Sequence, residues 1–329
     1  MRVFLTGGTG FVGYNLAAHL KREGHDIVCL IRRTSNTTFL ERVGGVEYVL
    51  GDLADGASLR DAVKAARPEA VVHLAGAVTA VRREGYFAVN TEGTRNLVEA
   101  VGLAAPALKR FVYVSSLAAG GPTRPGYPRT EQDEDRPVTH YGRSKKAAED
   151  ILLAYREELP SVILRPAAVY GPADIAVLGF FRAAARGISV GFLGRDLALS
   201  MIYVEDLTTA VVRALESSLP SGDLFYVSDG TEYRLMELHG RIARAVGTTV
   251  KRIRVPRFFL FPPAAVAEAV IRLRGRPGFF NWQKTIEAVQ PAWLCSPRKL
   301  ETRTGFHPRY DLDDGARATV AWYRQQGWI

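Results

Sequence analysis

The sequence predicts an α/β fold, in which a doubly wound parallel sheet is followed by a smaller, mostly helical C-terminal lobe. Strand-like apolar runs alternate with helical runs through the first half of the chain. A glycine-rich turn directly follows the first of these runs, where open parallel sheets bind their ligands. After Gly171 and Pro172 the alternation loosens. We therefore expect the rest of the chain to build a separate lobe.

Six apolar runs bounded by turn residues are predicted as strands. They are Val3 to Leu5, Ile27 to Ile31, Val46 to Leu50, Ala70 to Leu74, Arg110 to Ser115 and Ser161 to Leu164. Helical periodicity fills most of the intervals, and the first helix is expected from about Phe11. We expect residues 1–173 and 197–228 to form a nucleotide-binding sheet domain. Residues 174–196 and 229–329 are expected to form the substrate lobe.

Gly7, Gly10 and Gly13 lie between the first strand and the first helix. The first glycine allows a tight turn, and the second removes a side chain that phosphate groups would strike. The third lets the helix pack closely against the strand. This spacing in this context predicts that a dinucleotide is bound with its pyrophosphate at the start of the helix.

The composition is that of an ordinary globular protein, with 329 residues, 47% hydrophobic residues and a net charge of +9. Basic residues in the first half are scattered without interleaved aromatics, so we expect no nucleic-acid partner. Cys29 and Cys295 imply neither a disulfide framework nor a metal site, and the histidines lack metal-ligand spacing. We predict no metal. Because the first strand begins at residue 2, we expect no leader and a cytoplasmic location.

An apolar run from Phe258 to Leu273 is bracketed by basic residues. It is too short and interrupted to span a bilayer, which needs about 20 apolar residues. The favoured interpretation is a helix that starts near Pro263 and packs over a pocket, and the alternative is an interfacial membrane anchor. The basic residues are Lys251, Arg252, Arg254, Arg257, Arg272, Arg274 and Arg276.

A second pattern, Tyr141 and Lys145, is followed by a helical run. Their i, i+4 spacing places both side chains on one helix face, with Cβ atoms about 5–6 Å apart. A phenol with a pKa of about 10 becomes a usable proton donor and acceptor when a nearby ammonium favours its phenolate. Ser115 and Ser116 end a predicted strand and could join this pair.

With these motifs, the chain resembles the extended branch of the short-chain dehydrogenase/reductase superfamily, the NAD-dependent epimerase/dehydratase family. The resemblance implies that Tyr141 is the acid/base, that Ser116 polarises the substrate carbonyl and that Lys145 holds the nicotinamide ribose. It also implies that Asn90 supports the active-site helix and a water. The further matching segments are GDL at 51–53, HLAG at 73–76, NTEGT at 90–94, YVSS at 113–116, RPAAVYGP at 165–172 and YVEDL at 203–207.

The same resemblance implies a set of cofactor contacts. They are Gly7, Thr9, Gly10, Phe11, Val12 and Gly13 at the glycine turn, Asp52 and Leu53 at the adenine, Leu74, Ala75 and Gly76 along the cofactor path, and Pro166, Ala168 and Val169 at the nicotinamide. Family members often dimerise through the helices that hold Asn90 and Tyr141, so a homodimer is expected.

The end of the second predicted strand bears on cofactor choice. Ile31 stands where an NAD enzyme would place an acidic residue for the ribose 2′-hydroxyl, and Arg32 follows it. We therefore favour NADP(H) over NAD(H), with Arg32 binding the 2′-phosphate, Ser35 adding a hydrogen bond and Arg33 solvated. The alternative is that Arg32 stacks on the adenine and NAD is used.

Departures from the family pattern bear on the reaction. Leu117 and Ala118 replace the acidic pair that dehydratases carry after the serine. Ala168 and Leu199 stand where nucleotide-sugar epimerases hold a diphosphate with Asn and Arg, although Arg182, Arg186 or Arg195 could replace those anchors. A hydrophobic pocket is predicted instead, with burial in the core as the alternative for each member. Its residues are Ala168, Leu199, Met201, Phe180, Phe181, 258–273, Phe279, Phe280 and Trp282.

These features look like the dihydroflavonol reductase and 3β-hydroxysteroid dehydrogenase side of the branch. We predict an NADP(H)-dependent oxidoreductase that interconverts a ketone and a secondary alcohol on an apolar small molecule. One alternative is a nucleotide-sugar epimerase with tightly bound NAD. A second is a regulator that senses the cofactor without chemistry, against which the intact Ser116, Tyr141 and Lys145 argue.

Overall fold

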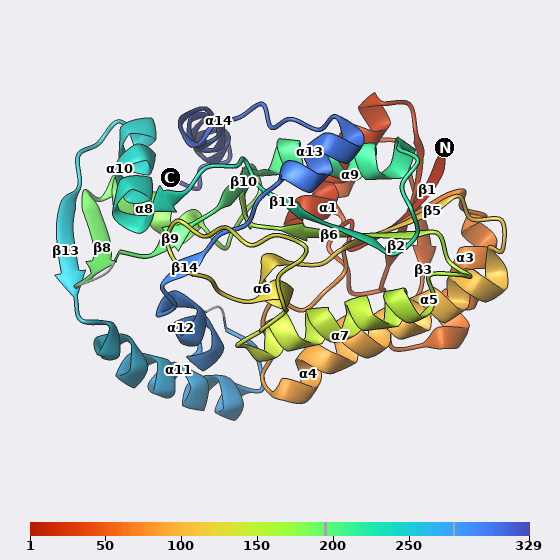
Figure 1. Ribbon diagram of the computed structural model, residues 1–329, viewed down its shortest axis with the longest axis horizontal. Helices are drawn as coiled ribbons and strands as arrows, with labels where there is room; N and C mark the ends of the chain where they lie inside the picture. The colour runs from red at the N-terminus through yellow and green to blue at the C-terminus, as the bar shows by residue number, and fades with distance from the viewer. Residues whose placement is uncertain (194–195, 279) are drawn as a thin grey trace.

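A computed structural model describes residues 1–193, 196–278 and 280–329, so Arg195 and Phe279 of the predictions above lie outside the described residues. Its centre is a parallel sheet in the order β3-β2-β1-β4-β5-β6-β11 (Figure 1). The strands are β1 Arg2–Thr6, β2 Asp26–Ile31, β3 Val46–Leu50, β4 Ala70–His73, β5 Arg110–Val114, β6 Ser161–Pro166 and β11 Asp223–Val227. The doubly wound sheet predicted from the sequence is confirmed.

Helices cover both faces of this sheet. α1 (Phe11–Arg22) and α9 (Val204–Glu216) lie on one face. The opposite face carries α3 (Gly56–Ala66), α5 (Gly93–Ala104) and α7 (His140–Ala154). Because strand side chains alternate in direction, the central strands contribute to two apolar layers and appear in the sequence as apolar runs. The edge strand β3, which contains Glu47, is largely exposed.

The seventh strand, β11, was not among the predicted strands. It pairs in parallel with β6, with Phe225 opposite Leu164. Its apolar run is only four residues long and follows Gly222, whose backbone has φ +82. An apolar run of this length does not distinguish a strand from a helix by itself. Its pairing with β6 at the edge of the sheet makes it a strand.

The C-terminal lobe is built on α8 (Leu178–Ala185), α10 (Leu235–Val246) and α14 (Leu312–Gln325), which share an apolar core. Outside the main sheet, the chain also forms short strand pairs that the sequence pattern did not reveal. They are β8 Ile188–Phe192 with β13 Lys251–Val255, β9 Ala198–Leu199 with β12 Tyr233–Arg234 and β14 Ala292–Trp293, and β7 Ala168–Tyr170 with β10 Met201–Tyr203.

Shorter helices connect these parts. They are α2 Thr38–Val43, α4 Arg83–Phe87, a π-helical turn Ala88–Glu92, α6 Leu117–Gly120, a 3-10 turn Arg257–Leu260, α11 Phe261–Arg274, α12 Trp282–Ala288 and α13 Arg298–Thr304. Within the described ranges, no helix is both long and apolar enough to cross a membrane.

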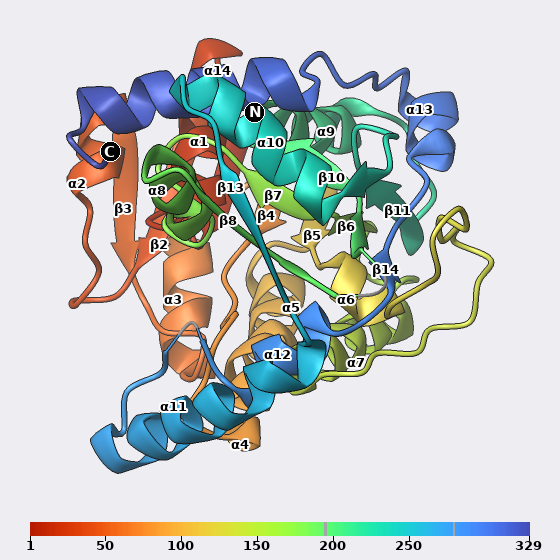
Figure 2. The ribbon, with the colours of Figure 1, turned by 90° about the vertical axis from the view of Figure 1, so that its left-hand side faces the viewer.

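The helix predicted near Pro263 is α11, which begins two residues earlier and carries both prolines in its first turn, where the missing N–H costs nothing. Within this helix, Ala264 and Ile271 are buried. Figure 2 shows α11 at the margin of the molecule, beyond the layers of the sheet. The prediction of a helix is confirmed, and its packing over a pocket stays a prediction.

Candidate active site

The parallel sheet brings the predicted site residues to one edge. Gly7 follows β1, Arg32 follows β2, Leu74 follows β4 and Ser115 follows β5, each within a residue of the strand's carboxyl end. The strand order reverses at β1, which has β2 on one side and β4 on the other. Ligands of open α/β sheets bind at such a point, so topology alone juxtaposes segments far apart in the sequence.

The glycine turn leaves room that any side chain would fill. Gly7 has φ +74, and a Cβ there would lie 2.6 Å from the backbone nitrogen of Ala75. A Cβ on Gly13 would lie 2.1 Å from the carbonyl oxygen of Gly7. Gly10 is the N-cap of α1, and no side chain caps this helix end. The open N–H groups and the close backbone fit a pyrophosphate group.

Thr9 lies in this turn, and Phe11 and Val12 open α1. The segment after β4 lies against the turn: the N–H of Leu74 donates to the carbonyl of Thr6 at 3.2 Å, and that of Ala75 donates to Thr6 Oγ1 at 3.3 Å. These two hydrogen bonds hold the backbone after β4 against the glycine turn that follows β1.

The outer part of the predicted cofactor path lies after β2 and β3. Asp52 Oδ1 accepts the N–H of Ala54 at 3.0 Å, and Asn96 donates to the carbonyl of Leu53 at 2.8 Å. Ser35 Oγ accepts the N–H of Arg32 at 2.9 Å, so the two residues predicted to bind a 2′-phosphate are adjacent. The exposed Arg32 guanidinium has no ion-pair partner among the residues that the structure describes.

The strip predicted at the nicotinamide ends β6 and forms β7. Pro166 is the last residue of β6, and Ala168 and Val169 belong to β7, which pairs with β10. Asn15 of α1 donates to the carbonyl of Pro172 at 3.0 Å. This bond ties the strip to the helix that begins at the glycine turn.

Tyr141 and Lys145 lie on the first turns of α7, whose N-cap Thr139 accepts the N–H of Gly142 at 3.1 Å. Lys145 Nζ donates to the carbonyl of Val114 at 2.8 Å and lies 4.3 Å from the centre of the Tyr113 ring. Burial lowers the pKa of Lys145 to about 7, although Glu149 opposes this shift. Burial raises the pKa of Tyr141 to about 12, and the Ser116 hydroxyl works against this rise.

The two adjacent serines differ in surroundings. Ser116 caps α6 by accepting the N–H of Ala118 at 3.1 Å, and its side chain interacts with the Tyr141 phenol. Ser115 is buried and donates to Glu149. The structure thus places Ser116, and not Ser115, beside Tyr141.

Asn90 connects the segment after β4 with α7. It lies in the π-helical turn, a distortion often found at functional sites. Asn90 Oδ1 accepts the N–H of Ala77 at 2.7 Å, and its Nδ2 donates to Ser144 Oγ at 2.9 Å. Ser144 Oγ in turn donates to the carbonyl of Tyr141 at 2.8 Å. A Cβ on Gly76 would lie 3.1 Å from Asn90 Oδ1.

His73 is a residue of this region that the sequence reasoning missed. Its Nδ1 lies 2.6 Å from Thr6 Oγ1, and its Nε2 lies 3.0 Å from Thr94 Oγ1. Burial, assisted by the Lys145 charge, lowers the pKa of His73 to about 3, so the ring is neutral. A histidine ending an apolar strand was the available signal. Its two bonds join β1, β4 and α5 directly beneath the site.

A buried charge cluster beneath α7 was also missed. Arg165 donates to both carboxylate oxygens of Glu149 and of Asp135 and to the Tyr226 hydroxyl. The Arg165 side chain is 3% exposed and that of Glu149 is 1% exposed. An arginine inside the apolar run VILRP was the signal that a buried partner must exist.

The residues predicted to line a hydrophobic pocket do not gather in one place. Phe181 is buried against Tyr323 at a ring-centre distance of 5.2 Å in the lobe core, and Phe180 lies 5.3 Å from His239. Met201 is opposite Ala168 across the β7–β10 pair. Leu199 in β9 is half-buried, whereas Phe280 and Trp282 are exposed. Phe181 and Met201 are therefore core residues, the alternative allowed from the sequence.

The lobe instead presents polar side chains of α12 to the start of α7. Gln283 Oε1 accepts the N–H of His140 at 2.8 Å, and Glu287 lies 3.4 Å from Thr139 Oγ1. Lys284 Nζ lies 5.6 Å from the centre of the Tyr141 ring. These contacts place α12 next to Tyr141, which the sequence did not predict.

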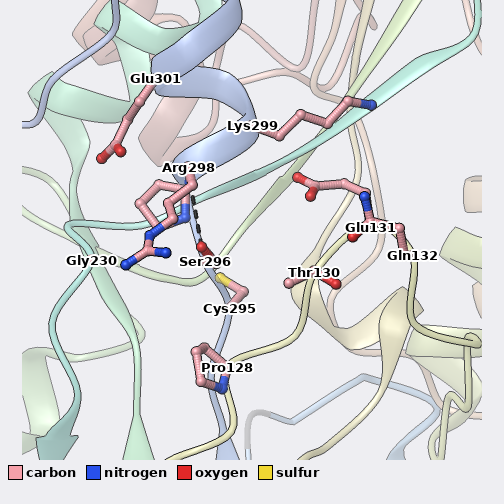
Figure 3. A pocket seen from close by; sticks show the side chains of 11 residues that line it. Pro128, Thr130, Glu131, Gln132, Gly230, Cys295, Ser296, Arg298, Lys299 and Glu301 are labelled. Carbon is pink, nitrogen blue, oxygen red and sulfur yellow. Dashed lines mark hydrogen bonds between the residues drawn. The ribbon is translucent and has the colours of Figure 1, made fainter.

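A cavity of about 600 Å³ lies elsewhere, between the loop at Pro128 to Gln132 and the start of α13 (Figure 3). Glu131, Arg298 and Lys299 line it, and Lys299 is paired with Asp223 at 3.1 Å. Because none of the predicted site residues lines this cavity, we assign it no part in the proposed chemistry. The described residues also contain no group of three or more His, Cys, Asp and Glu that could hold a metal.

The burial of Lys145 predicts how the free energy of unfolding depends on pH. Its pKa is about 7 in the folded chain and about 10.5 when exposed, so the unfolded chain binds more protons between these values. Folding stability contributed by this site therefore rises with pH from about 7 to 10.5. We expect Lys145→Met to have a higher free energy of unfolding than the parent, measured by urea denaturation. The difference should be largest below pH 7, where the parent buries a charged ammonium, and should shrink as the pH rises above 7. Parallel stability curves for the two proteins would contradict this prediction.

The fold and the site define an NAD(P)-dependent enzyme of the short-chain dehydrogenase/reductase type. The chain belongs to the NAD dependent epimerase/dehydratase family, whose model matches residues 3–227. This confirms the family inferred from the motifs.

Relatives with different chemistry resemble the chain over almost its whole length. A ceramide reductase from Caulobacter vibrioides is 33% identical over 330 residues, covering 99% of this chain and 96% of the relative. A probable UDP-glucuronate 4-epimerase from Rhizobium meliloti is 28% identical over 347 residues, covering 99% and 97%. The crystal structure of the Bordetella bronchiseptica enzyme WbmG in complex with NAD and UDP has a TM-score of 0.79 and 26% identity, covering 100% and 96%.

Proposed function

We propose that the protein is an NADP(H)-dependent oxidoreductase that interconverts a ketone and a secondary alcohol on a largely apolar substrate. The observation that carries the proposal is the arrangement of Tyr141 beside Ser116 with Lys145 buried next to them. The resemblance to a ceramide reductase, which acts on a lipid, supports an apolar substrate. In this proposal residues 1–173 and 197–228 bind the cofactor, and 174–196 and 229–329 bind the substrate.

In the proposed chemistry Tyr141 is the proton donor. Burial raises the pKa of this phenol to about 12, so it is protonated at neutral pH; the ordinary phenol, whose pKa is about 10, is protonated there as well. The phenol donates its proton to the carbonyl oxygen of the substrate, and the Ser116 hydroxyl donates a hydrogen bond to the same oxygen. The bound cofactor supplies the hydride. In this proposal Lys145, whose ammonium donates to the carbonyl of Val114, binds the ribose, and Asn90 supports the first turn of α7.

The chain lacks the two polar side chains with which nucleotide-sugar enzymes of the family hold a diphosphate. A buried diphosphate needs charge-assisted partners. Ala168 and Leu199 occupy the two family positions for such partners, and neither can donate a hydrogen bond from its side chain. We test this with purified protein, NADPH and two panels, one of apolar ketones and one of 4-keto nucleotide sugars. NADPH oxidation by the ketones supports the proposal, and oxidation by the nucleotide sugars alone overturns it.

The similarity to a probable UDP-glucuronate 4-epimerase favours a second candidate, an epimerase with tightly bound NAD. The same Tyr141 and Lys145 would serve it, and no net oxidation would occur. Denaturing the purified protein and assaying the supernatant for NAD separates the two. Stoichiometric NAD with no ketone turnover would favour the epimerase. Cofactor binding without any turnover would favour the regulator instead.

Arg32 is proposed to select NADP(H) by binding the 2′-phosphate. A charge-assisted contact of this kind contributes about 1.5–3 kcal/mol, so Arg32→Ala should raise the KM for NADPH by roughly 10-fold to 100-fold. The KM for NADH should change little. Arg33→Ala is the matched control, because it removes the neighbouring exposed guanidinium. Equal effects of the two substitutions, or a parent that prefers NADH, would refute this role.

We also propose a homodimer formed through α5 and α7, the helices that follow Asn90 and hold Tyr141. Light scattering in solution tests it: a monomer at all concentrations would refute the proposal.

A further inference from the structure

The segment 257–276, called here the α11 arm, stands at the margin of the fold. It comprises the 3-10 turn, α11 and the two residues that follow it. Figures 1 and 2 both show α11 at the bottom of the molecule, away from α9 and α13 at the top. Outside the arm itself, α11 packs mainly against α12.

The arm is apolar on two opposite sides. Ala264 and Ile271 are buried and define the side that faces the protein. The other side carries Val266, which is 66% exposed, and Leu273, which is 88% exposed. Phe259 precedes them by about two helical turns and is 58% exposed. Apolar side chains gathered on the outer side of a helix mark a surface that binds a partner, and here this side lacks a cover.

The uncovered side is bordered by positive charge. Arg272, Arg274 and Arg276 are exposed at the end of α11, and Arg254 is exposed just before the arm. Glu268 is the only acidic residue of 257–276, and it pairs with Arg272 at 3.3 Å. An excess of exposed basic side chains therefore lies beside exposed Val, Leu and Phe side chains.

We infer that the α11 arm docks on an anionic lipid surface. Its apolar side chains would enter the headgroup boundary, while the arginines reach the lipid phosphates with their aliphatic stems along the surface. A second copy is a poorer occupant, because a twofold contact places the same basic border against itself. The inference concerns binding alone and stands independently of the proposed reaction.

The test is sedimentation with vesicles of phosphatidylglycerol and phosphatidylcholine, compared with pure phosphatidylcholine, using the whole chain without substrate. We expect binding to the anionic vesicles that weakens with salt. Arg274→Glu/Arg276→Glu should reduce the partition coefficient about tenfold or more, because each basic residue near the surface contributes. Leu273→Gln should reduce it as well, through lost apolar burial.

Two matched controls separate the arm from general charge and hydrophobicity. Arg213→Glu/Arg303→Glu changes the net charge equally, on α9 and α13. Leu50→Gln removes a leucine that is 56% exposed at the end of β3, outside the helices of the proposed dimer. These variants should bind like the parent. The inference is overturned if the parent does not bind anionic vesicles, or if arm and control variants lose binding equally. It is also overturned if an arm variant abolishes self-association of the protein while its binding to vesicles is unchanged, because the arm would then contact a second copy.

Discussion

Replacing Tyr141 with phenylalanine should lower kcat for ketone reduction by about 10²- to 10⁴-fold, the usual contribution of a positioned general acid. The substitution removes one oxygen and keeps the ring, so the packing around α7 is retained. Without the phenol, Ser116 loses the neighbouring group that would give its proton to the substrate. Steady-state turnover of NADPH with a ketone substrate measures the effect.

The matched control is Tyr155→Phe at the other end of the same helix, where Tyr155 is the C-cap. It should leave kcat unchanged. Binding of NADPH and the melting temperature should be similar in both variants and the parent. If Tyr141→Phe retained more than a tenth of the parent kcat, the assignment of the proton donor would be wrong.

Replacing Arg165 with methionine should cost about 3–5 kcal/mol of unfolding free energy, because it leaves the buried carboxylate of Glu149 without its arginine partner. The partly exposed Asp135 loses the same partner. Burial already raises the pKa of Glu149 against the effect of Arg165. The cluster also adjoins Lys145, whose pKa Glu149 raises. Urea denaturation followed by circular dichroism measures the loss.

Arg136→Met is the control for this prediction. Arg136 pairs with Glu134 at 2.7 Å, but both side chains are about three-quarters exposed, so the pair should contribute less than about 1 kcal/mol. Similar losses in the two variants would show that burial does not set the energy of the Arg165 cluster. If Arg165→Met does not fold, Glu149→Gln, which keeps the size of the side chain, should still lose more stability than Arg136→Met.

The core of the fold was predictable because local pattern and topology agree. Gly7 and Gly13 are needed for close backbone approach, and that need is visible as a spacing between an apolar run and a helix. The parallel order of the sheet then fixes where residues such as Ser116 and Gly76 must lie. The ends of the central strands were predicted closely because both faces of the sheet are buried there.

The parts that escaped prediction depend on contacts between distant segments. Arg165 looks out of place in its strand until Asp135 and Glu149 are known to meet it. Phe181 has the same apolar character as a pocket residue, and only its packing on Tyr323 assigns it to the core. The position of α12 beside Tyr141 follows from hydrogen bonds of Gln283, which no periodicity reveals.

The central claim is net reduction of an apolar ketone by this site. The most direct test uses NADPH deuterated at the transferable position of C4, an apolar ketone and the parent enzyme, with mass spectrometry of the product. We expect an alcohol with one deuterium on the carbinol carbon, formed in an amount equal to the NADP⁺ produced. Unchanged ketone and NADPH, with a nucleotide sugar epimerised by enzyme that retains NAD, would contradict it.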